Sequence, residues 1–294
     1  MGVHYQYFDM TQKDTYTDVS REGAKFNLID PYATVVYNSD FGLNINAGAR
    51  LNTHSEYGNQ VVYHFNPSYS FENLPLKVLA SYSTAYITPS LYQLYGPYGN
   101  LGLTPEENAT TEFGFESQLM DKKITINAVG FYREEQNTFG FFYNPATFQS
   151  NYINVYEIYE AKGVETTVRC AFSEKFNVGG NYTFTQVEKQ LNRLIPKHKG
   201  NVDVSYVFNR GTFGMQYQYV DQRNDAFYDS TIWATQAVDL SAYQVVNSNI
   251  AYEFLPNRCT IFVAVTNIFN ENFQEIIGYN TRGRNYKLGL NFMF

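Results

Sequence analysis

The last eleven residues, 284 to 294, constrain the fold of this chain more than any other segment. They read RNYKLGLNFMF, with apolar and polar side chains in alternate positions and Met293 as the one exception. A two-residue period predicts a β-strand with one apolar face. A strand that ends on an aromatic residue is expected to be tied into a sheet. The apolar positions are Tyr286, Leu288, Leu290, Phe292 and Phe294.

The same alternation recurs from one end of the chain to the other. In the segment 41 to 51, for example, every odd position is apolar and every even position is Gly or Asn, apart from Arg50. Most such segments have about ten residues, the length that a tilted strand needs to cross a bilayer. We predict fourteen strands, at 2–10, 27–37, 41–51, 60–70, 76–86, 109–119, 123–133, 160–172, 175–187, 198–208, 211–221, 241–254, 258–267 and 284–294.

The connections between these segments alternate in length. Short ones rich in turn residues occupy 38–40, 72–75, 121–122, 173–174, 209–210 and 256–257. Long ones occupy 11–26, 52–59, 87–108, 134–159, 188–197, 222–240 and 268–283. This alternation is typical of an antiparallel up-and-down transmembrane β-barrel, with tight turns on the periplasmic rim and loops outside. No domain boundary is evident, so we predict a single all-β barrel domain over residues 1–294.

Composition supports this class and excludes others. Mean hydropathy is −0.38 and no eighteen apolar residues run together, which excludes helical membrane spans. The 27 Tyr and 24 Phe match a barrel with aromatic girdles and a polar lumen. A net charge of −7 without a basic run argues against nucleic-acid binding.

Other local features set further expectations. Cys170 and Cys259 occupy apolar positions on distant strands, so we expect two free, buried thiols and no disulfide. No basic segment followed by an apolar core comes after Met1, so no signal peptide is predicted. For an exported protein, we then expect the front of the chain to be missing through processing or because this is a part of a longer chain.

Enzyme chemistry is not indicated. The four histidines, His4, His54, His64 and His198, lack the spacing of metal ligands, and no nucleophile or phosphate-binding motif occurs. His198 near Glu188 or Asp203 could imitate a barrel hydrolase, but we interpret it as a polar residue of the lumen or rim. We predict no enzyme, no metal and no cofactor.

The terminal strand also resembles a known signal. The pattern Lys287, Gly289, Phe292, Phe294 is similar to the C-terminal signal by which bacterial outer-membrane barrels are recognised for insertion. This resemblance implies the barrel assembly machinery and the lipid bilayer as partners, and the bacterial outer membrane as the location.

The run from Ser81 to Glu116 resembles the TonB-dependent outer-membrane receptors. Its motifs are the segment 89–95 (PSLYQLY), Gly99-Asn100, the segment 103–106 (LTPE) and Glu112-Phe113-Gly114, and further matches lie at 162–165, 267–270 and 283–286. The resemblance spans about residue 60 to the end. It implies a barrel of about twenty-two strands with a lumen-filling plug that TonB contacts. This chain resembles the last fourteen strands, with the plug absent.

Within that family, the segments 93–96, 98–100 and 278–284 look most like the cobalamin receptors. The resemblance implies binding of cobalamin or a related corrinoid by outer loops, and import when TonB, driven by the proton gradient, remodels the plug. Catecholate-siderophore receptors share much of this arrangement of sequence motifs, so a ferric siderophore is the alternative ligand. The calcium-binding loops of cobalamin receptors belong to earlier loops, so no metal site carries over.

Aromatic residues in the long loops are the candidate ligand contacts. Flat ring faces can hold a corrin or a catecholate at low entropic cost. The alternative is that these rings are girdle or loop-packing residues. Glu112 and Arg133 are expected in a polar lining that contacts the plug. The candidates are Tyr92, Tyr95, Tyr98 and Asn100 in one loop, and Phe227, Tyr228 and Trp233 in another.

Two hypotheses of other classes stay open. A complete fourteen-stranded passive pore, such as a fatty-acid-type channel, predicts that the first strand is hydrogen-bonded to the last. A soluble β-rich interaction module predicts solubility without detergent.

Overall fold

The computed structural model describes residues 1–11, 24–144, 146–188 and 193–293. Strands dominate it, and the helix among these residues is the short α1, Leu91–Tyr95. The strands are β1 Gly2–Asp9, β2 Lys25–Asn38, β3 Leu43–His54, β4 Gly58–Ser70, β5 Leu76–Ile87, β6 Glu106–Leu119, β7 Ile124–Gln136, β8 Thr138–Asn144, β9 Gln149–Val155, β10 Tyr159–Ala171, β11 Phe176–Val187, β12 His198–Phe208, β13 Gly211–Val220, β14 Arg223–Asp229, β15 Ala234–Leu240, β16 Tyr243–Leu255, β17 Cys259–Thr266 and β18 Asn285–Phe292. Among the described residues, no helix is both long and apolar enough to cross a membrane.

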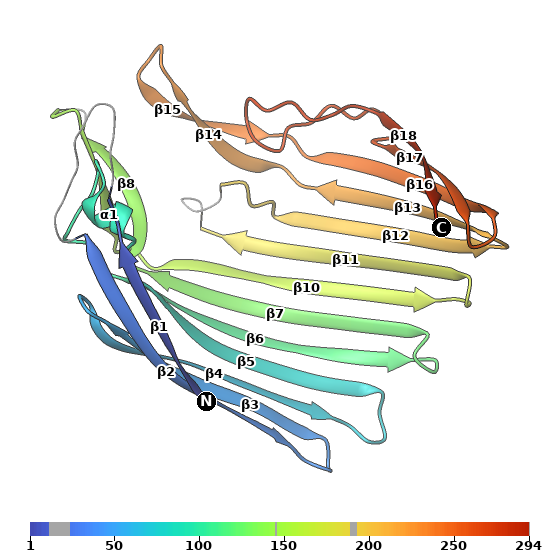
Figure 1. Ribbon diagram of the computed structural model, residues 1–294, viewed down its shortest axis with the longest axis horizontal. Helices are drawn as coiled ribbons and strands as arrows, with labels where there is room; N and C mark the ends of the chain where they lie inside the picture. The colour runs from blue at the N-terminus through green and yellow to red at the C-terminus, as the bar shows by residue number, and fades with distance from the viewer. Residues whose placement is uncertain (12–23, 145, 189–192, 294) are drawn as a thin grey trace. The chain divides into compact units, whose positions relative to one another are not determined.

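Fourteen of these strands form one sheet, in the order β1-β2-β3-β4-β5-β6-β7-β10-β11-β12-β13-β16-β17-β18. Successive strands of the order lie side by side in Figure 1. Each predicted strand corresponds to one strand of this sheet, and the ends differ by no more than three residues. The predicted all-β, up-and-down fold is therefore confirmed.

The chain divides into two compact units, which are described separately. Unit 1 comprises Met1–Glu72, Val78–Phe113 and Phe131–Ala161, and unit 2 comprises Asn73–Lys77, Gly114–Gly130 and Lys162–Phe294.

In unit 2 the alternation predicted from the sequence produces one apolar and one polar face. Apolar residues face each other across neighbouring strands, as in Ile250 opposite Val263 and Val263 opposite Leu288. These apolar side chains are exposed, and Leu288 keeps 70% of its surface accessible. Asp203 lies opposite Gln216 on the other face. The apolar face is thus left exposed, whereas a water-soluble sheet would bury it.

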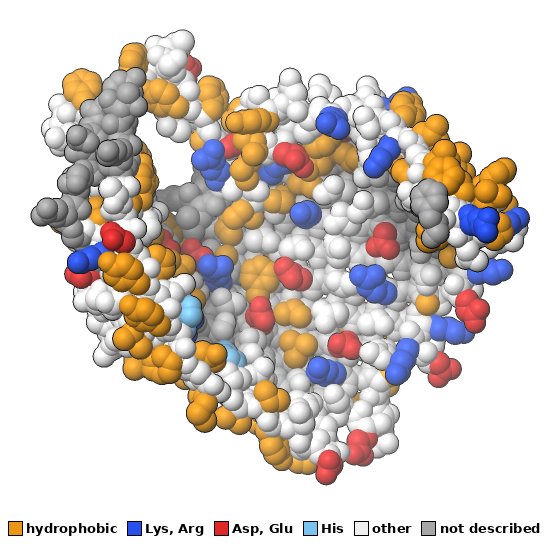
Figure 2. All heavy atoms as spheres, in the orientation of Figure 1, with side chains coloured by type: hydrophobic (Ala, Val, Ile, Leu, Met, Phe, Trp, Pro, Cys, Tyr) orange, Lys and Arg blue, Asp and Glu red, His pale blue; other side chains and the backbone are white. Residues whose placement is uncertain are grey.

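Unit 1 follows the same rule. Ala47 lies opposite Phe65 on the apolar face, whereas Asn46 lies opposite Asn66 on the polar face. Figure 2 shows acidic and basic side chains scattered over the sheet surface that is turned to the viewer.

Two predicted loops contain additional strands. The segments 134–159 and 222–240 form the two-stranded sheets β8–β9 and β14–β15, so the prediction of strand-free connections was wrong there. Aromatic and β-branched residues flank a turn in each, and such residues favour a hairpin. The predicted loops 11–26 and 188–197 lie partly outside the described residues.

The cysteines are both free thiols, but they differ in burial. Cys259 is buried and Cys170 is half-buried. The prediction of burial was wrong for Cys170, because an apolar position on this sheet does not imply a position inside a core.

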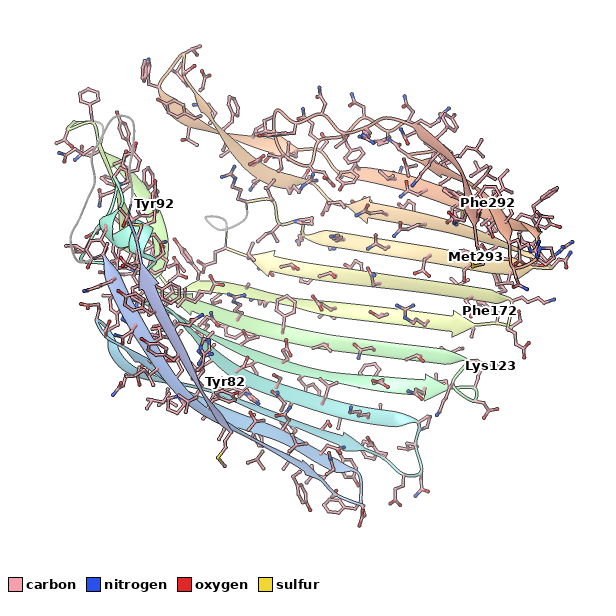
Figure 3. The ribbon with its side chains drawn as sticks, in the orientation of Figure 1. Tyr82, Tyr92, Lys123, Phe172, Phe292 and Met293 are labelled. Atoms are coloured by element: carbon pink, nitrogen blue, oxygen red, sulfur yellow. The ribbon has the colours of Figure 1, made fainter. Side chains whose placement is uncertain are left out.

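The terminal strand has the predicted apolar face, with Tyr286, Leu288, Leu290 and Phe292 all exposed, while Phe294 lies outside the described residues. Figure 3 places Phe292 and Met293 at the turn end of the unit 2 strands, as it does Lys123 and Phe172. Gly289 and Lys287 belong to the opposite face. There the Phe262 ring covers Gly289, and Lys287 Nζ lies 5.6 Å from the centre of the same ring.

Replacement of Gly289 by valine is expected to destabilise the chain by about 1–3 kcal/mol, the usual cost of overpacking. A Cβ at this position would overlap the Phe262 ring, which must then leave its place across the β17–β18 pair. Urea unfolding in detergent measures the effect.

Gly200→Ala is the control, because a Cβ there meets its nearest neighbour, the Asn181 carbonyl oxygen, at an ordinary 3.5 Å. Equal stability of the two variants would contradict the assigned packing role of Gly289.

Candidate ligand-binding loops

The candidate loop of unit 1 is built around α1. Ser90 caps the helix: the Gln93 N–H donates to Ser90 Oγ at 3.3 Å, and the Ser90 N–H donates to Gln93 Oε1 at 2.8 Å. Leu91 and Leu94 are the buried residues of this helix, and Leu103, further along the loop, is 2% exposed. The buried leucines thus anchor the loop, while Tyr92, a residue of α1 itself, stays exposed (Figure 3).

The β8–β9 hairpin packs against this loop through backbone groups and two asparagines. Asn100 Nδ2 donates to the Tyr152 carbonyl at 2.9 Å, and the Tyr152 N–H donates to the Tyr98 carbonyl at 3.0 Å. Asn154 is 9% exposed, and its amide makes a reciprocal pair with the backbone of Thr104, at 2.8 Å in each direction. The hairpin and the loop therefore form one structure.

Four aromatic rings meet where the loop and the hairpin join. Phe141 lies 5.5 Å from Tyr98 and 5.4 Å from Tyr152, and Tyr92 lies 6.4 Å from Tyr152, all with edge-to-face geometry. Tyr92, Tyr98 and Phe141 are exposed. Phe141 and Tyr152 were missed by the sequence analysis, although the alternation in the segment 138–144 could have indicated the strand that presents Phe141.

Tyr95, the last residue of α1, is half-buried. Its neighbour Tyr57 belongs to the connection between β3 and β4. Burial, followed by the proximity of Tyr86, Tyr95 and Glu56, raises the pKa of Tyr57 to about 12. The Tyr57 hydroxyl therefore stays neutral at physiological pH.

The second set of candidates belongs to unit 2. Phe227 and Tyr228 lie on β14, and Trp233 lies in the turn of the β14–β15 hairpin with a φ of 54°. All three are exposed, Trp233 with 76% of its surface. Within unit 2, Figure 1 shows this hairpin extending beyond the ends of β13 and β16. The structure thus brings together Tyr92, Tyr98 and Asn100, and it places Phe227, Tyr228 and Trp233 on a separate hairpin.

A buried carboxylate lies at the base of that hairpin. Asp225 is 2% exposed and accepts hydrogen bonds from Arg193 Nε at 2.9 Å, the Ile277 N–H at 2.8 Å and the Ala226 N–H at 2.8 Å. Burial alone would raise the pKa of this carboxyl, but the two backbone donors and Arg193 outweigh it, so the pKa lies below the ordinary value of 3.8.

The hydrogen bonds of Asp225 are expected to persist from pH 7 to about pH 4 and to be lost only at lower pH. A carboxyl with a lowered folded-state pKa contributes stability above its unfolded pKa and loses it as the pH falls through the folded value. Acrylamide quenching of Trp233 emission during acid titration follows the hairpin. Asp225→Asn removes this titration, and a wild-type transition centred above pH 5 would contradict the assignment.

Aromatic packing fixes the other side of the hairpin base. Arg223 is buried, lies over the Tyr243 ring at 5.1 Å and donates from Nη2 to the Gln274 carbonyl at 2.7 Å. Tyr243 stacks on Phe273 with ring centres 4.1 Å apart. The segment 268–283 is therefore joined to β14 and β16.

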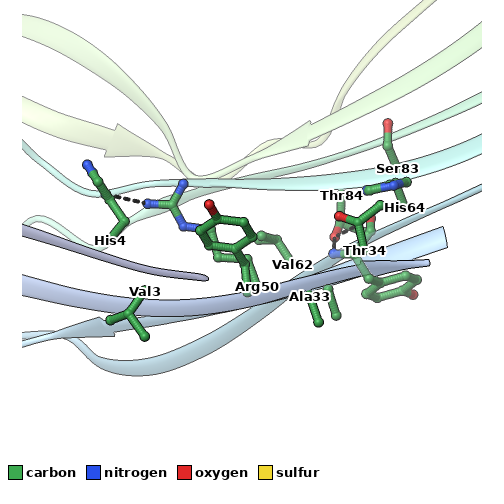
Figure 4. Close-up of a pocket in the computed structure, with 12 residues that line it drawn as sticks. Val3, His4, Ala33, Thr34, Arg50, Val62, His64, Ser83 and Thr84 are labelled. Atoms are coloured by element: carbon green, nitrogen blue, oxygen red, sulfur yellow. Dashed lines mark hydrogen bonds between the residues drawn. The ribbon is translucent and has the colours of Figure 1, made fainter. Parts of the chain in front are cut away.

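A polar cluster that sequence analysis did not predict lies on β1, β2 and β3 of unit 1. The Asp30 carboxylate is 1% exposed and pairs with Arg50, whose Nε lies 3.1 Å from Oδ2. Arg50 Nη2 also lies 3.1 Å from His4 Nδ1. His4, Arg50 and His64 line a cavity of about 600 Å³ (Figure 4).

The remaining candidates have local partners. Arg133 forms an ion pair with Glu135 at 2.6 Å, and Glu112 is half-buried on β6. His198 Nδ1 lies 2.7 Å from the Tyr182 hydroxyl, whereas Asp203 lies on the other face of β12, so the two do not form an acid–histidine pair. In the described part of the chain, no three His, Cys, Asp or Glu side chains gather as potential metal ligands.

Comparison with known proteins identifies similar curated proteins. The chain is 29% identical to the vitamin B12 transporter BtuB of Vibrio cholerae over 255 residues, which cover 85% of this chain and 40% of the transporter. The chain thus spans about 40% of the length of the curated relatives it matches.

Solved structures support the fold. The pyoverdine receptor FpvA of Pseudomonas aeruginosa superimposes with a TM-score of 0.75 at 16% identity, covering 92% of this chain and 42% of that receptor. The ferric enterobactin receptor PfeA of the same organism superimposes with a TM-score of 0.75 at 18% identity, covering 90% of this chain and 45% of that receptor. The family model described as "TonB dependent receptor-like, beta-barrel" matches residues 1–268. The chain therefore belongs to the TonB-dependent receptor β-barrel family, a family of receptors and transporters.

Proposed function

We propose that this chain is the barrel part of an outer-membrane receptor that binds cobalamin or a related corrinoid and imports it. The observation that carries this proposal is the 29% identity to a vitamin B12 transporter over 85% of the chain. The loop motifs at 93–96, 98–100 and 278–284, which resemble cobalamin receptors, support the same ligand class.

The location follows from the exposed apolar face. Side chains such as Leu288 and Leu290 need an apolar solvent, and a bilayer provides one. The polar face then lines the lumen of a single barrel domain. The barrel assembly machinery would recognise Lys287, Gly289, Phe292 and Phe294, and TonB would act through the plug that the resemblance to the receptors implies.

The aromatic rings of unit 1 provide suitable ligand contacts. Tyr92, Tyr98 and Phe141 are exposed, and the hairpin holds them in fixed relative positions. Rigid rings can cover a flat macrocycle without losing much side-chain entropy. Phe227, Tyr228 and Trp233 would provide a second contact surface.

A ferric siderophore is the second candidate ligand. The sequence frame that the chain shares with catecholate-siderophore receptors favours it, whereas the likeness to the enterobactin receptor at 18% identity concerns the fold alone.

Equilibrium binding of cyanocobalamin and ferric enterobactin to the purified protein in detergent tests the proposal. We expect saturable cyanocobalamin binding that ferric enterobactin does not displace, and an affinity about tenfold lower in Tyr98→Ala. Tyr156→Ala, which removes an exposed aromatic residue outside the cluster, should bind as the wild type does. Binding of ferric enterobactin alone would replace the corrinoid proposal.

A passive pore is the remaining transport alternative. It requires pairing of β1 with β18, so cysteines introduced beside Tyr5 and Tyr286 would crosslink in membranes. Efficient crosslinking together with ion conductance in the absence of TonB would replace the receptor proposal.

A further inference from the structure

Asp225 joins three chain segments that are far apart in the sequence. Its carboxylate accepts hydrogen bonds from Arg193, which follows β11, from the Ala226 N–H of its own strand, and from the Ile277 N–H between β17 and β18. We propose that this loop junction, consisting of Asp225, Arg193 and the N–H groups of Ala226 and Ile277, holds the β14–β15 hairpin in position for ligand. Asp225 is then a positioning residue rather than a ligand contact.

The donors show that the junction is built around an ionised carboxylate. Oδ1 accepts hydrogen bonds from Arg193 Nε and from the Ala226 N–H, and Oδ2 accepts one from the Ile277 N–H. The side chain of Asp225 has no exposed surface, whereas that of Arg193 is 62% exposed. A buried carboxylate surrounded by donors from three segments stabilises only the arrangement in which all three meet.

Backbone contacts extend the junction on the Arg193 side. Arg193 Nη2 donates to the Ala226 carbonyl at 3.2 Å, and the Leu194 N–H donates to the Asn224 carbonyl at 2.7 Å. Arg193 and Asn224 also form a parallel bridge. Arg193 and Leu194 therefore lie along the start of β14.

The contacts of Arg223 extend it on the other side. Arg223 donates to the Gln274 carbonyl, and Thr281 Oγ1 donates to the Phe273 carbonyl at 2.6 Å. Because Phe273 stacks on Tyr243 of β16, the segment that provides the Ile277 N–H is itself fixed to the sheet. The junction thus connects the hairpin to a supported surface.

The hairpin needs such support. An isolated two-stranded hairpin is marginally stable in water. Its exposed aromatic residues begin two positions after Asp225, so motion at the base is transmitted directly to Phe227 and Tyr228. A hairpin that is ordered before the ligand arrives avoids the ordering cost at binding, which lengthens the life of the complex.

This inference rests on the proposed function only for the measurement that uses cyanocobalamin. The fluorescence of Trp233 reports the position of the hairpin in the absence of ligand. Trp233 is the single tryptophan of the chain. The contribution of Trp233 to the fluorescence of each variant is obtained by subtracting the emission of the same variant that also carries Trp233→Phe. We would measure acrylamide quenching and anisotropy of this signal, and the dissociation rate of cyanocobalamin, in Asp225→Ala and Arg193→Gln.

We expect Asp225→Ala to lower the anisotropy of Trp233, raise its quenching about twofold and speed cyanocobalamin dissociation about tenfold, with little change in the association rate. Arg193→Gln keeps both backbone donors and should give a smaller change in the same direction. Asp239→Asn is the matched control, since it removes a charge from an exposed position of the same hairpin, opposite Asn224, and should behave as wild type.

Unchanged Trp233 signals in both junction variants would overturn the inference, and so would a mobile Trp233 with an unchanged dissociation rate. Absence of any cyanocobalamin binding to the wild type would instead refute the proposed ligand, and the Trp233 signals would still decide whether the junction holds the hairpin.

Discussion

Replacement of Arg50 by alanine is expected to destabilise the protein by about 3 kcal/mol or more. Asp30 has 2% of its side chain exposed, and Arg50 is its main partner, bonded through both Nε and Nη2. Without Arg50, the Asp30 carboxylate still accepts a hydrogen bond from the Thr53 N–H, which lies 3.2 Å from Oδ1. The carboxylate stays buried, and most of its charge is then unpaired. Urea unfolding in detergent, followed by circular dichroism, measures the loss.

Two further variants make this prediction specific. Arg133→Ala breaks an exposed ion pair whose side chains are 45% and 29% accessible, and it should cost less than about 1 kcal/mol. The double variant Arg50→Ala/Asp30→Asn removes the unpaired charge and should be more stable than Arg50→Ala alone. A double variant that is less stable than the single one would show that the charge of Asp30 is not the source of the cost.

Asn154→Leu is expected to detach the β8–β9 hairpin from the α1 loop and to weaken corrinoid binding at least about tenfold. The asparagine bonds both backbone groups of Thr104 and also donates to the Asn137 carbonyl at 2.7 Å. Leucine has a similar volume but cannot replace these three hydrogen bonds, each of which contributes about 0.5–1.5 kcal/mol to stability. Hydrogen exchange at Thr104 and in the hairpin, together with cyanocobalamin affinity, measures the effect.

The matched control for this variant is Asn151→Ala in the same hairpin. Asn151 Nδ2 donates to the carbonyl of its neighbour Tyr152, a contact within one strand, so its loss should leave exchange at Thr104 unchanged. Slow exchange at Thr104 in Asn154→Leu would contradict the idea that this side chain holds the hairpin in place. Loss of affinity without faster exchange would indicate that Asn154 acts on the ligand in another way.

The candidate ligand residues stay predictions, and only part of the aromatic cluster around them could be selected from the sequence. Aromatic residues in long connections could be selected from the sequence. In the structure, the Tyr92 ring contacts Tyr152 and the Tyr98 ring contacts Phe141. Those partners were not selected, because the segment that carries them was interpreted as a plain loop. Asp225 and Arg193 were also missed, since a single charged residue in a loop carries no periodic signal.

The sequence alone determined the strands, the order in which they pair, the alternation of tight turns with long connections, and the apolar face. These properties depend on residues close together in the chain: a two-residue period defines a face, and turn residues such as Asn209 and Asn257 adopt positive φ where strands reverse. The terminal strand illustrates this, since its alternation predicted the apolar face that carries Leu288 and Leu290.

Only the tertiary structure decided how the outer segments pack and which polar groups are buried. Asn154 meets Thr104 across 50 residues, and Asp225 meets Ile277 across 52. Such pairs form because a buried polar group must find a partner wherever the fold brings one, and sequence spacing carries no record of that distance in space. For this reason the alternating pattern predicted the sheet, whereas the contacts that arrange its outer loops became visible only in three dimensions.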